Sequence, residues 1–333
     1  MSKNGASGGS AVKVVVAILL AVIALFLLIF TATRLFSFSP DRPEEDPNAS
    51  GKWRPALEED TITYEGVTYK RKSRVESYLI LGVDKTEEQR KTGQAGQADV
   101  LLLLVLDAEQ QAYRILNINR DTVTQITVLS PDGSISSEKF EPICLSHAYG
   151  TGGPESCENT VRSVEYLLAG IKPDGYIALD LTAIGVLNDA VGGVTVTVDK
   201  DLTAMHPALK KGATVKLDAA SAEAYVRARM YVGEEDNLSR MNRQVGYMTA
   251  WFRQAQALGE QRLIGLLDSI EEVCVTDLTE KRLAAVADIA MKYENLGFCA
   301  LDGEYVRTVS FNEFHADDDS VTQMILELFY TAE

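Results

Sequence analysis

Positive charge is scarce in this sequence. Its 333 residues contain 32 Lys and Arg against 48 Asp and Glu, which gives a formal net charge of −16, and it contains three histidines. Nonspecific nucleic-acid binding depends on a basic surface, so this charge balance argues against a nucleic-acid partner. The few arginines that stand close to aspartates therefore become the first candidates for a site.

One long apolar run interrupts the polar sequence. Residues 14–33 carry no charged side chain, and at about 1.5 Å per residue a helix of that length crosses a hydrocarbon core of about 30 Å. The alternative is a cleaved signal peptide, whose apolar core is shorter, about 7–15 residues. Lysines precede the run and acidic residues follow it. The positive-inside rule thus predicts a cytoplasmic tail at 1–13, a transmembrane helix at 14–34 and an extracellular remainder, in a single-pass protein of the cell membrane.

Cysteine is also sparse, and its spacing gives no zinc motif. All cysteines lie beyond the apolar run, and they are Cys144, Cys157, Cys274 and Cys299. No C-x-x-C pair occurs among them, whereas an even number outside a membrane permits disulfides. Neighbours along the chain close the shortest loops, so the expected pairs are Cys144–Cys157 and Cys274–Cys299. Free buried thiols are the alternative.

The extracellular part has the pattern of an α/β domain. Residues 35–72 begin as a Pro- and acid-rich stalk and end in a short hairpin. The apolar runs expected to form strands lie at 77–83, 100–106 and 113–118. The middle run is apolar at every position, which is typical of a strand covered on both faces. Segments with helical spacing lie at 158–170, 182–190, 219–229 and 278–293. We therefore predict a three-layer domain over 73–333, with a parallel or a mixed sheet.

Aspartates stand at the ends of two predicted strands. Asp84 ends the first run and Asp99 precedes the second, so both carboxylates can meet at one edge of the sheet. Mg²⁺ commonly takes one or two carboxylates and leaves its other positions to water and phosphates. Either aspartate could equally cap a strand or a turn.

Arginines follow the same strands and reappear later in the chain. Arg120 and Asp121 come directly after the third run, where an arginine can fork onto a phosphate and the aspartate can orient it. Arg227 and Arg229 would point about 200° apart in a helix, so both reach one ligand only where the helix has ended. Arg240 and Gln244 share a helix face. Each of these residues could otherwise belong to a solvated charged face.

The order of these motifs resembles the LytR-CpsA-Psr family of cell-envelope proteins. The motifs are GVD, ADV, NRDT, HAYGTGG, DAVGG, VRAR and DNLSRMNRQ, and the resemblance covers roughly residues 73–330. It implies a central mixed sheet flanked by helices, with an apolar pocket for a polyprenyl chain. It also implies a Mg²⁺-dependent phosphotransferase with weak pyrophosphatase activity. The expected substrate is a teichoic acid or capsular polymer on a polyprenyl-pyrophosphate lipid, and the expected acceptor is peptidoglycan.

The resemblance also assigns roles to individual positions. It gives the metal to Asp84 and Asp99, and the catalytic roles around the pyrophosphate to Arg120, Asp121, Arg227 and Arg229. Substrate binding falls to Arg240, Gln244, Arg90 and Tyr149.

Three positions depart from what the family usually shows. Gln97 stands where arginine is common, Asn119 where proline is common and Cys144 where lysine is common. Lys85, Arg90 or His147 could replace the lost charge. The losses also keep open a second function, a non-catalytic carrier or regulator that binds polyprenyl pyrophosphate. A third is a structural envelope protein without a ligand.

Overall fold

The computed structural model describes residues 60–85, 88–89, 92–228, 273–308 and 312–333, with seven further positions between 243 and 254. The predicted tail, transmembrane helix and most of the stalk lie outside these residues. Within the part of the chain that is described, no helix is long and apolar enough to cross a membrane.

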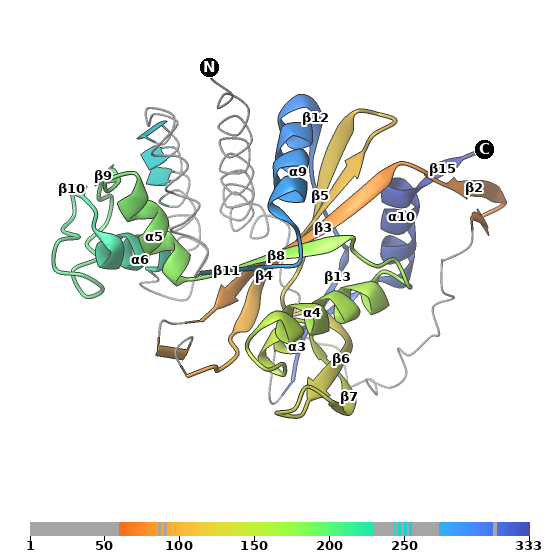
Figure 1. Cartoon of the computed structure of the whole chain (residues 1–333), viewed down its shortest axis with the longest axis horizontal. Helices are drawn as coiled ribbons and strands as arrows, with labels where there is room; N and C mark the ends of the chain where they lie inside the picture. The colour runs from red at the N-terminus through yellow and green to blue at the C-terminus, as the bar shows by residue number, and fades with distance from the viewer. Residues whose placement is uncertain are drawn as a thin grey trace, which may run out of the picture.

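A six-stranded sheet forms the centre of the domain (Figure 1). Its strands, in spatial order, are β11 (Cys274–Thr276), β8 (Gly175–Asp180), β3 (Val75–Asp84), β4 (Gln97–Asp107), β5 (Ala112–Ile118) and β12 (Glu294–Ala300). The pairs β3–β8 and β5–β12 are parallel, and the other three are antiparallel. The sheet is therefore mixed, and the three predicted apolar strands are neighbours within it.

Helices cover both faces of this sheet. Helices α4 (Pro154–Leu167) and α10 (Asp318–Phe329) pack on one face, which presents Leu101 and Leu103, among others. Helix α9 (Glu280–Lys292) packs on the other face, which presents Leu102 and Leu104. Successive residues of a strand point to opposite faces, so both faces of β4 need apolar side chains. The predicted layered α/β fold is confirmed, and the continuous apolar run has this physical cause.

A second hydrophobic cluster lies beside β8. It contains α5 (Thr182–Ala190), α6 (Ala219–Arg227) and the short hairpin of β9 (Thr195–Thr197) and β10 (Thr214–Lys216), seen on the left in Figure 1. Asp218 starts α6 as its N-cap, accepting a hydrogen bond from the Ser221 backbone in a capping box. The helix ends at Arg227, because Ala228 has φ −50° and ψ 122°. The backbone thus leaves the helix in the middle of the VRAR motif.

Three further hairpins lie around the sheet in the described part of the chain. The predicted hairpin at the start of the domain is confirmed as β1 (Thr61–Tyr64) and β2 (Val67–Arg71), and β15 (Tyr330–Ala332) adds a third strand to it. The other hairpins are β6 (Val123–Leu129) with β7 (Ile135–Pro142), and β13 (Gly303–Arg307) with β14 (Asn312–Ala316). The helical turn α3 (Leu145–Ala148) follows β7.

Both expected disulfides are wrong, since all four cysteines are free. Cys274 lies on β11 and Cys299 on β12, the opposite edges of the six-stranded sheet. Five inter-strand steps of about 4.8 Å separate them by roughly 24 Å, whereas a disulfide needs Cα atoms within about 7 Å. Cys144 and Cys157 are buried and contact other groups, Cys144 the Arg120 side chain and Cys157 the His147 ring. The alternative of free thiols is the one that the structure supports.

Candidate functional site

The ends of three neighbouring strands lie together at one end of the central sheet. Asp84 ends β3 and pairs with Gln97 at the start of β4, while Leu101 of β4 pairs with Ile118 at the end of β5. The β3–β4 register shifts from Gly82↔Val100 to Val83↔Ala98, which leaves Asp99 as an extra, bulged residue. A bulge bends the strand and redirects its side chain. Asp84, Asp99 and the segment that carries Arg120 therefore lie at the same end of these three strands.

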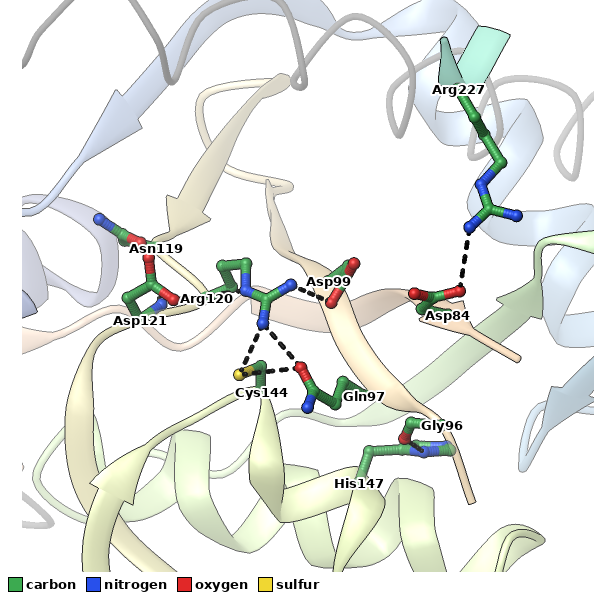
Figure 2. A network of polar contacts seen from close by, with 10 residues as sticks. All are labelled: Asp84, Gly96, Gln97, Asp99, Asn119, Arg120, Asp121, Cys144, His147 and Arg227. Carbon is green, nitrogen blue, oxygen red and sulfur yellow. Dashed lines mark hydrogen bonds and ion pairs between the residues drawn. The ribbon is translucent and has the colours of Figure 1, made fainter. Parts of the chain in front are cut away.

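Arg120 is the centre of this cluster (Figure 2). Its guanidinium forms an ion pair with Asp99, lies 3.3 Å from a carboxylate oxygen of Asp121, and donates to Oε1 of Gln97 at 2.7 Å. It also contacts the sulfur of Cys144 at 3.4 Å. Gln97 and Cys144, the two positions that lack the usual positive charge, therefore both contact the guanidinium of Arg120. These uncharged side chains fix the position of the positive charge that Arg120 supplies.

The hairpin β6–β7 brings Cys144 to Arg120. The strands begin just after Asp121 and end just before Cys144, and across their base the Cys144 amide donates to the Arg120 carbonyl at 3.0 Å. Burial raises the pKa of the Cys144 thiol to about 11, and the charge of Arg120 opposes that rise only in part. The thiol is therefore neutral at physiological pH.

Asp121 has an environment suited to proton transfer. Burial raises the pKa of its carboxyl, and the neighbouring Arg120 partly offsets the rise. Its backbone amide donates to Oδ1 of Asn119 at 3.0 Å, an Asx turn that fixes the local backbone. A carboxylate whose pKa moves toward neutral accepts a proton more effectively than an ordinary one.

A second arginine–aspartate pair lies at the end of β3. Nη2 of Arg227 lies 3.5 Å from Oδ1 of Asp84, and Nη1 of the same side chain lies 2.7 Å from Glu223 one helical turn earlier. The end of α6 at Arg227 meets the condition under which neighbouring arginines of VRAR could reach one ligand. Arg229 itself lies outside the described residues, as do Arg90, Arg240 and Gln244.

The two aspartates suit a magnesium ion in their chemistry. Asp84 and Asp99 supply hard carboxylate oxygens from adjacent strand ends, a set that Mg²⁺ accepts when water or phosphate completes its shell. In the described part of the chain, no three His, Cys, Asp or Glu residues gather as a metal cluster. Each carboxylate is also paired with an arginine, so a metal would compete with both ion pairs.

Lys85 and His147 fasten the β3–β4 connection. The Lys85 ammonium donates to the Gly152 carbonyl at 2.7 Å, and Nδ1 of His147 lies 2.7 Å from the Gly96 carbonyl. Burial lowers the pKa of His147 to about 4, and its bond to Gly96 counters this only partly. His147 is therefore neutral at physiological pH. Both side chains are buried, and both hold the loop.

Two further residues change the expected site. The Tyr149 hydroxyl donates to Glu141 of β7 at 2.9 Å, so it joins the hairpin next to the site and not the arginine cluster. Arg243, which carried no assigned role, is 2% exposed and donates to the Ala228 carbonyl at 2.6 Å. It thereby supports the backbone of VRAR. It lies in the DNLSRMNRQ motif between Arg240 and Gln244, but its burial cannot be read from that spacing.

Comparisons with solved structures agree with this fold. The gbs0355 protein of Streptococcus agalactiae matches with a TM-score of 0.56 at 20% identity, covering 77% of this chain and 87% of that one. TagT of B. subtilis matches with a TM-score of 0.51 at 20% identity, covering 77% and 90%. At such identities the likeness concerns the fold alone.

Sequence relatives lead to a family. The teichoic acid transferase TagU of Halalkalibacterium halodurans is 29% identical over 203 residues, which covers 61% of this chain and 60% of the relative. TagU of Bacillus mycoides is 29% identical over 225 residues, covering 67% and 66%. The matches therefore span less than two thirds of these relatives. The model of the LytR_cpsA_psr family matches residues 48–328, most of the chain, and so this protein belongs to the LytR_cpsA_psr family.

Proposed function

We propose that this protein is a membrane-anchored extracellular phosphotransferase that moves a glycopolymer from a polyprenyl-pyrophosphate carrier to peptidoglycan. The observation that carries the proposal is the meeting of Asp84, Asp99, Arg120 and Asp121 at one sheet edge in a member of this family. The relatives named polyisoprenyl-teichoic acid–peptidoglycan teichoic acid transferases support teichoic acid as the polymer. The anchor would be the apolar segment 14–34, with the domain at 73–333 outside the membrane.

The described side chains suit the transfer of a phosphoryl group. Such a reaction needs charge neutralisation and alignment more than a protein nucleophile. Arg227 would move from Asp84 onto an oxygen of the pyrophosphate, where arginine forms forked hydrogen bonds. Arg120, which Asp121 and Gln97 hold in place, would turn from Asp99 toward a second phosphate oxygen. Asp84 and Asp99 would hold Mg²⁺, which supplies further neutralisation of the phosphate charge when bound.

The bonds and protons of the step balance without another reactant. A hydroxyl of the peptidoglycan sugar attacks the phosphorus that carries the polymer, forming a new P–O bond. The P–O bond to the bridging oxygen breaks, and polyprenyl phosphate leaves with that bonding pair. Asp121, which the Asn119 side chain holds beside Arg120, would accept the hydroxyl proton. Water in place of the sugar would give the weak pyrophosphatase activity.

The test uses the full-length chain in detergent with a short polyprenyl-pyrophosphate glycan and a peptidoglycan oligomer. Transfer should require Mg²⁺ and stop with a chelator, and Arg120→Ala should lose it. A matched control is Arg114→Ala, since Arg114 lies on β5, the strand that precedes Arg120, and pairs with Glu327 away from the end of that strand. Equal transfer by the Arg120 and Arg114 variants would remove the basis of the proposal.

A non-catalytic carrier is the second candidate. The absence of positive charge at Gln97 and Cys144, both of which contact Arg120, favours it. Polyprenyl pyrophosphate bound to the purified chain, with no transfer at any Mg²⁺ concentration, would support a carrier over an enzyme.

A further inference from the structure

The hairpin β13–β14 lies against the segment that carries Arg120 and Asp121. The Phe314 amide donates to the Asp121 carbonyl at 2.7 Å, and Phe314 forms a parallel bridge with Thr122. Its side chain is fully buried. A hairpin almost two hundred positions further along the chain therefore supports the backbone on the C-terminal side of Arg120.

Asn119 connects the same hairpin to the N-terminal side of Arg120. Its Nδ2 donates to the Tyr305 hydroxyl at 2.7 Å, while its Oδ1 accepts from the Asp121 amide at 3.0 Å. Tyr305 lies on β13, and its ring meets that of Phe314 edge to face with centroids 5.3 Å apart. One asparagine side chain thus links the hairpin to the backbone amide of the aspartate that follows the arginine.

These contacts hold both flanks of the central arginine. The guanidinium of Arg120 is fixed at its tip by Asp99 and Gln97, whereas its backbone is fixed by its two neighbours in sequence. Both neighbours contact the hairpin. A proline at position 119 would have no side-chain amide to donate to the Tyr305 hydroxyl, so the link depends on the asparagine that this chain carries.

We propose that Tyr305 is a positioning residue of the candidate site, acting through Asn119 on the placement of Arg120 and Asp121. The inference rests on the proposed function only for its kinetic consequence. Displacing catalytic groups by even a fraction of an ångström slows a transfer step more than it weakens substrate binding. Tyr305 therefore influences turnover without touching the reacting atoms.

The first experiment needs no activity. Hydrogen–deuterium exchange is measured on the full-length chain and on Tyr305→Phe, which keeps the ring contact with Phe314 and removes only the hydroxyl. Amides of residues 119–126 should exchange about five- to tenfold faster in the variant, because the Asx turn loses its outer support. Amides of β8, which lies elsewhere in the sheet, should be unchanged. The matched control is Tyr166→Phe, since the Tyr166 ring packs on Phe140 of β7, the partner strand of β6. This variant removes a hydroxyl near the monitored residues without altering the link from Tyr305 to Asn119.

The second experiment is a double-mutant cycle on transfer. Tyr305→Phe and Asn119→Ala should each lower kcat about tenfold with KM changed less than about twofold, and the double variant should be no slower than the slower single variant. Tyr166→Phe should match the wild type.

Unchanged exchange at residues 119–126 in Tyr305→Phe would overturn the inference, whatever the activity. So would additive losses of kcat in the double variant. Absence of transfer by the wild type would instead reject the proposed function, and the exchange result would still decide the role of Tyr305.

Discussion

The two arginine–aspartate pairs of the site differ in how firmly they are held. Arg120 contacts Asp99, Asp121, Gln97 and Cys144, and its backbone neighbours are tied to a second hairpin. Arg227 is the last residue of α6, and its guanidinium forms ion pairs with Asp84, at 3.5 Å, and with Glu223. Both pairs combine a candidate metal ligand with a candidate phosphate ligand.

This difference indicates that the two arginines have different roles. Both arginine–aspartate pairs are partly exposed, and exposed ion pairs contribute little and are screened by salt. Arg227 has fewer contacts than Arg120 in the described part of the chain, so its side chain can move to a new partner at smaller cost. Arg120 is already placed by several contacts, and preorganised groups contribute most where charge develops in a transition state. We expect Arg120 to determine the rate and Arg227 to adapt to the ligand.

Removal of the two guanidinium groups should separate these roles most strongly. Arg120→Ala should lower kcat/KM by about 10²–10³-fold, the range found when one preorganised donor is lost. Arg227→Ala should lower it by about tenfold, mainly through KM. Steady-state transfer assays on the full-length chain measure both. Equal losses, or a larger loss for Arg227, would contradict this difference in roles.

The stability of the protein should depend on pH through His147, which holds the β3–β4 connection between the two arginine–aspartate pairs. The folded-state pKa of about 4 lies below the ordinary value of 6.5, so the unfolded chain binds the proton first. This contribution to stability is present above pH 6.5 and is lost as the pH falls toward 4. At about pH 5 the wild type should have lost about 2 kcal/mol more of its unfolding free energy than His147→Asn, relative to neutral pH.

Denaturant unfolding of both chains at the two pH values gives this difference. The asparagine amide can still donate to the Gly96 carbonyl in place of Nδ1, so it is the conservative replacement. Parallel pH dependence of the two chains would show that His147 is not buried in its neutral form.

Magnesium affinity should distinguish the pairs by a smaller factor. Each arginine competes with a metal for its aspartate, and Arg120 is the closer partner. Arg120→Gln should therefore tighten Mg²⁺ binding, measured by calorimetry without phosphate, by about tenfold, and Arg227→Gln by about threefold. Arg114→Gln is the control. Unchanged affinity in both site variants would show that neither carboxylate binds the metal.

The smallest effect is expected at Cys144. Its thiol is neutral below its raised pKa of about 11, so it offers Arg120 a weak contact and no charge. Cys144→Ala should change kcat/KM by less than about twofold, since Asp99 and Gln97 still hold the arginine. Alkylation of the native thiol should remain slow at neutral pH. A large loss of transfer in the alanine variant would assign Cys144 a direct role.

The sequence predicted the centre of the fold better than its periphery. Apolar runs identify β3, β4 and β5, because burial on both faces leaves a local composition signal. Strand β12 escaped prediction because its sequence, ENLGFCA, begins with exposed polar residues at the edge of the sheet. The wrong pairing of Cys274 with Cys299 has a similar cause, since proximity along the chain says nothing about strand order.

The site was predictable where it depends on strand ends and not where it depends on distant elements. Asp84, Asp99 and Arg120 follow from the boundaries of neighbouring strands. The contact of Arg227 with Asp84 and the link from Asn119 to Tyr305 join residues that are 143 and 186 positions apart. The resemblance of the GVD and VRAR motifs to the family places Asp84 and Arg227 in one site, but periodicity does not indicate either pair, and no motif indicates the link to Tyr305.

Strand β3 sets the distance between the start of the domain and the candidate site. It runs from Val75, shortly after the β1–β2 hairpin, to Asp84 at the site. Ten residues at about 3.3 Å each span about 30 Å. If the domain is tethered through the residues before Thr61, the length of β3 adds to the length of the tether. Shortening the tether would then change the distance between its attachment point and the site without altering the residues of the site.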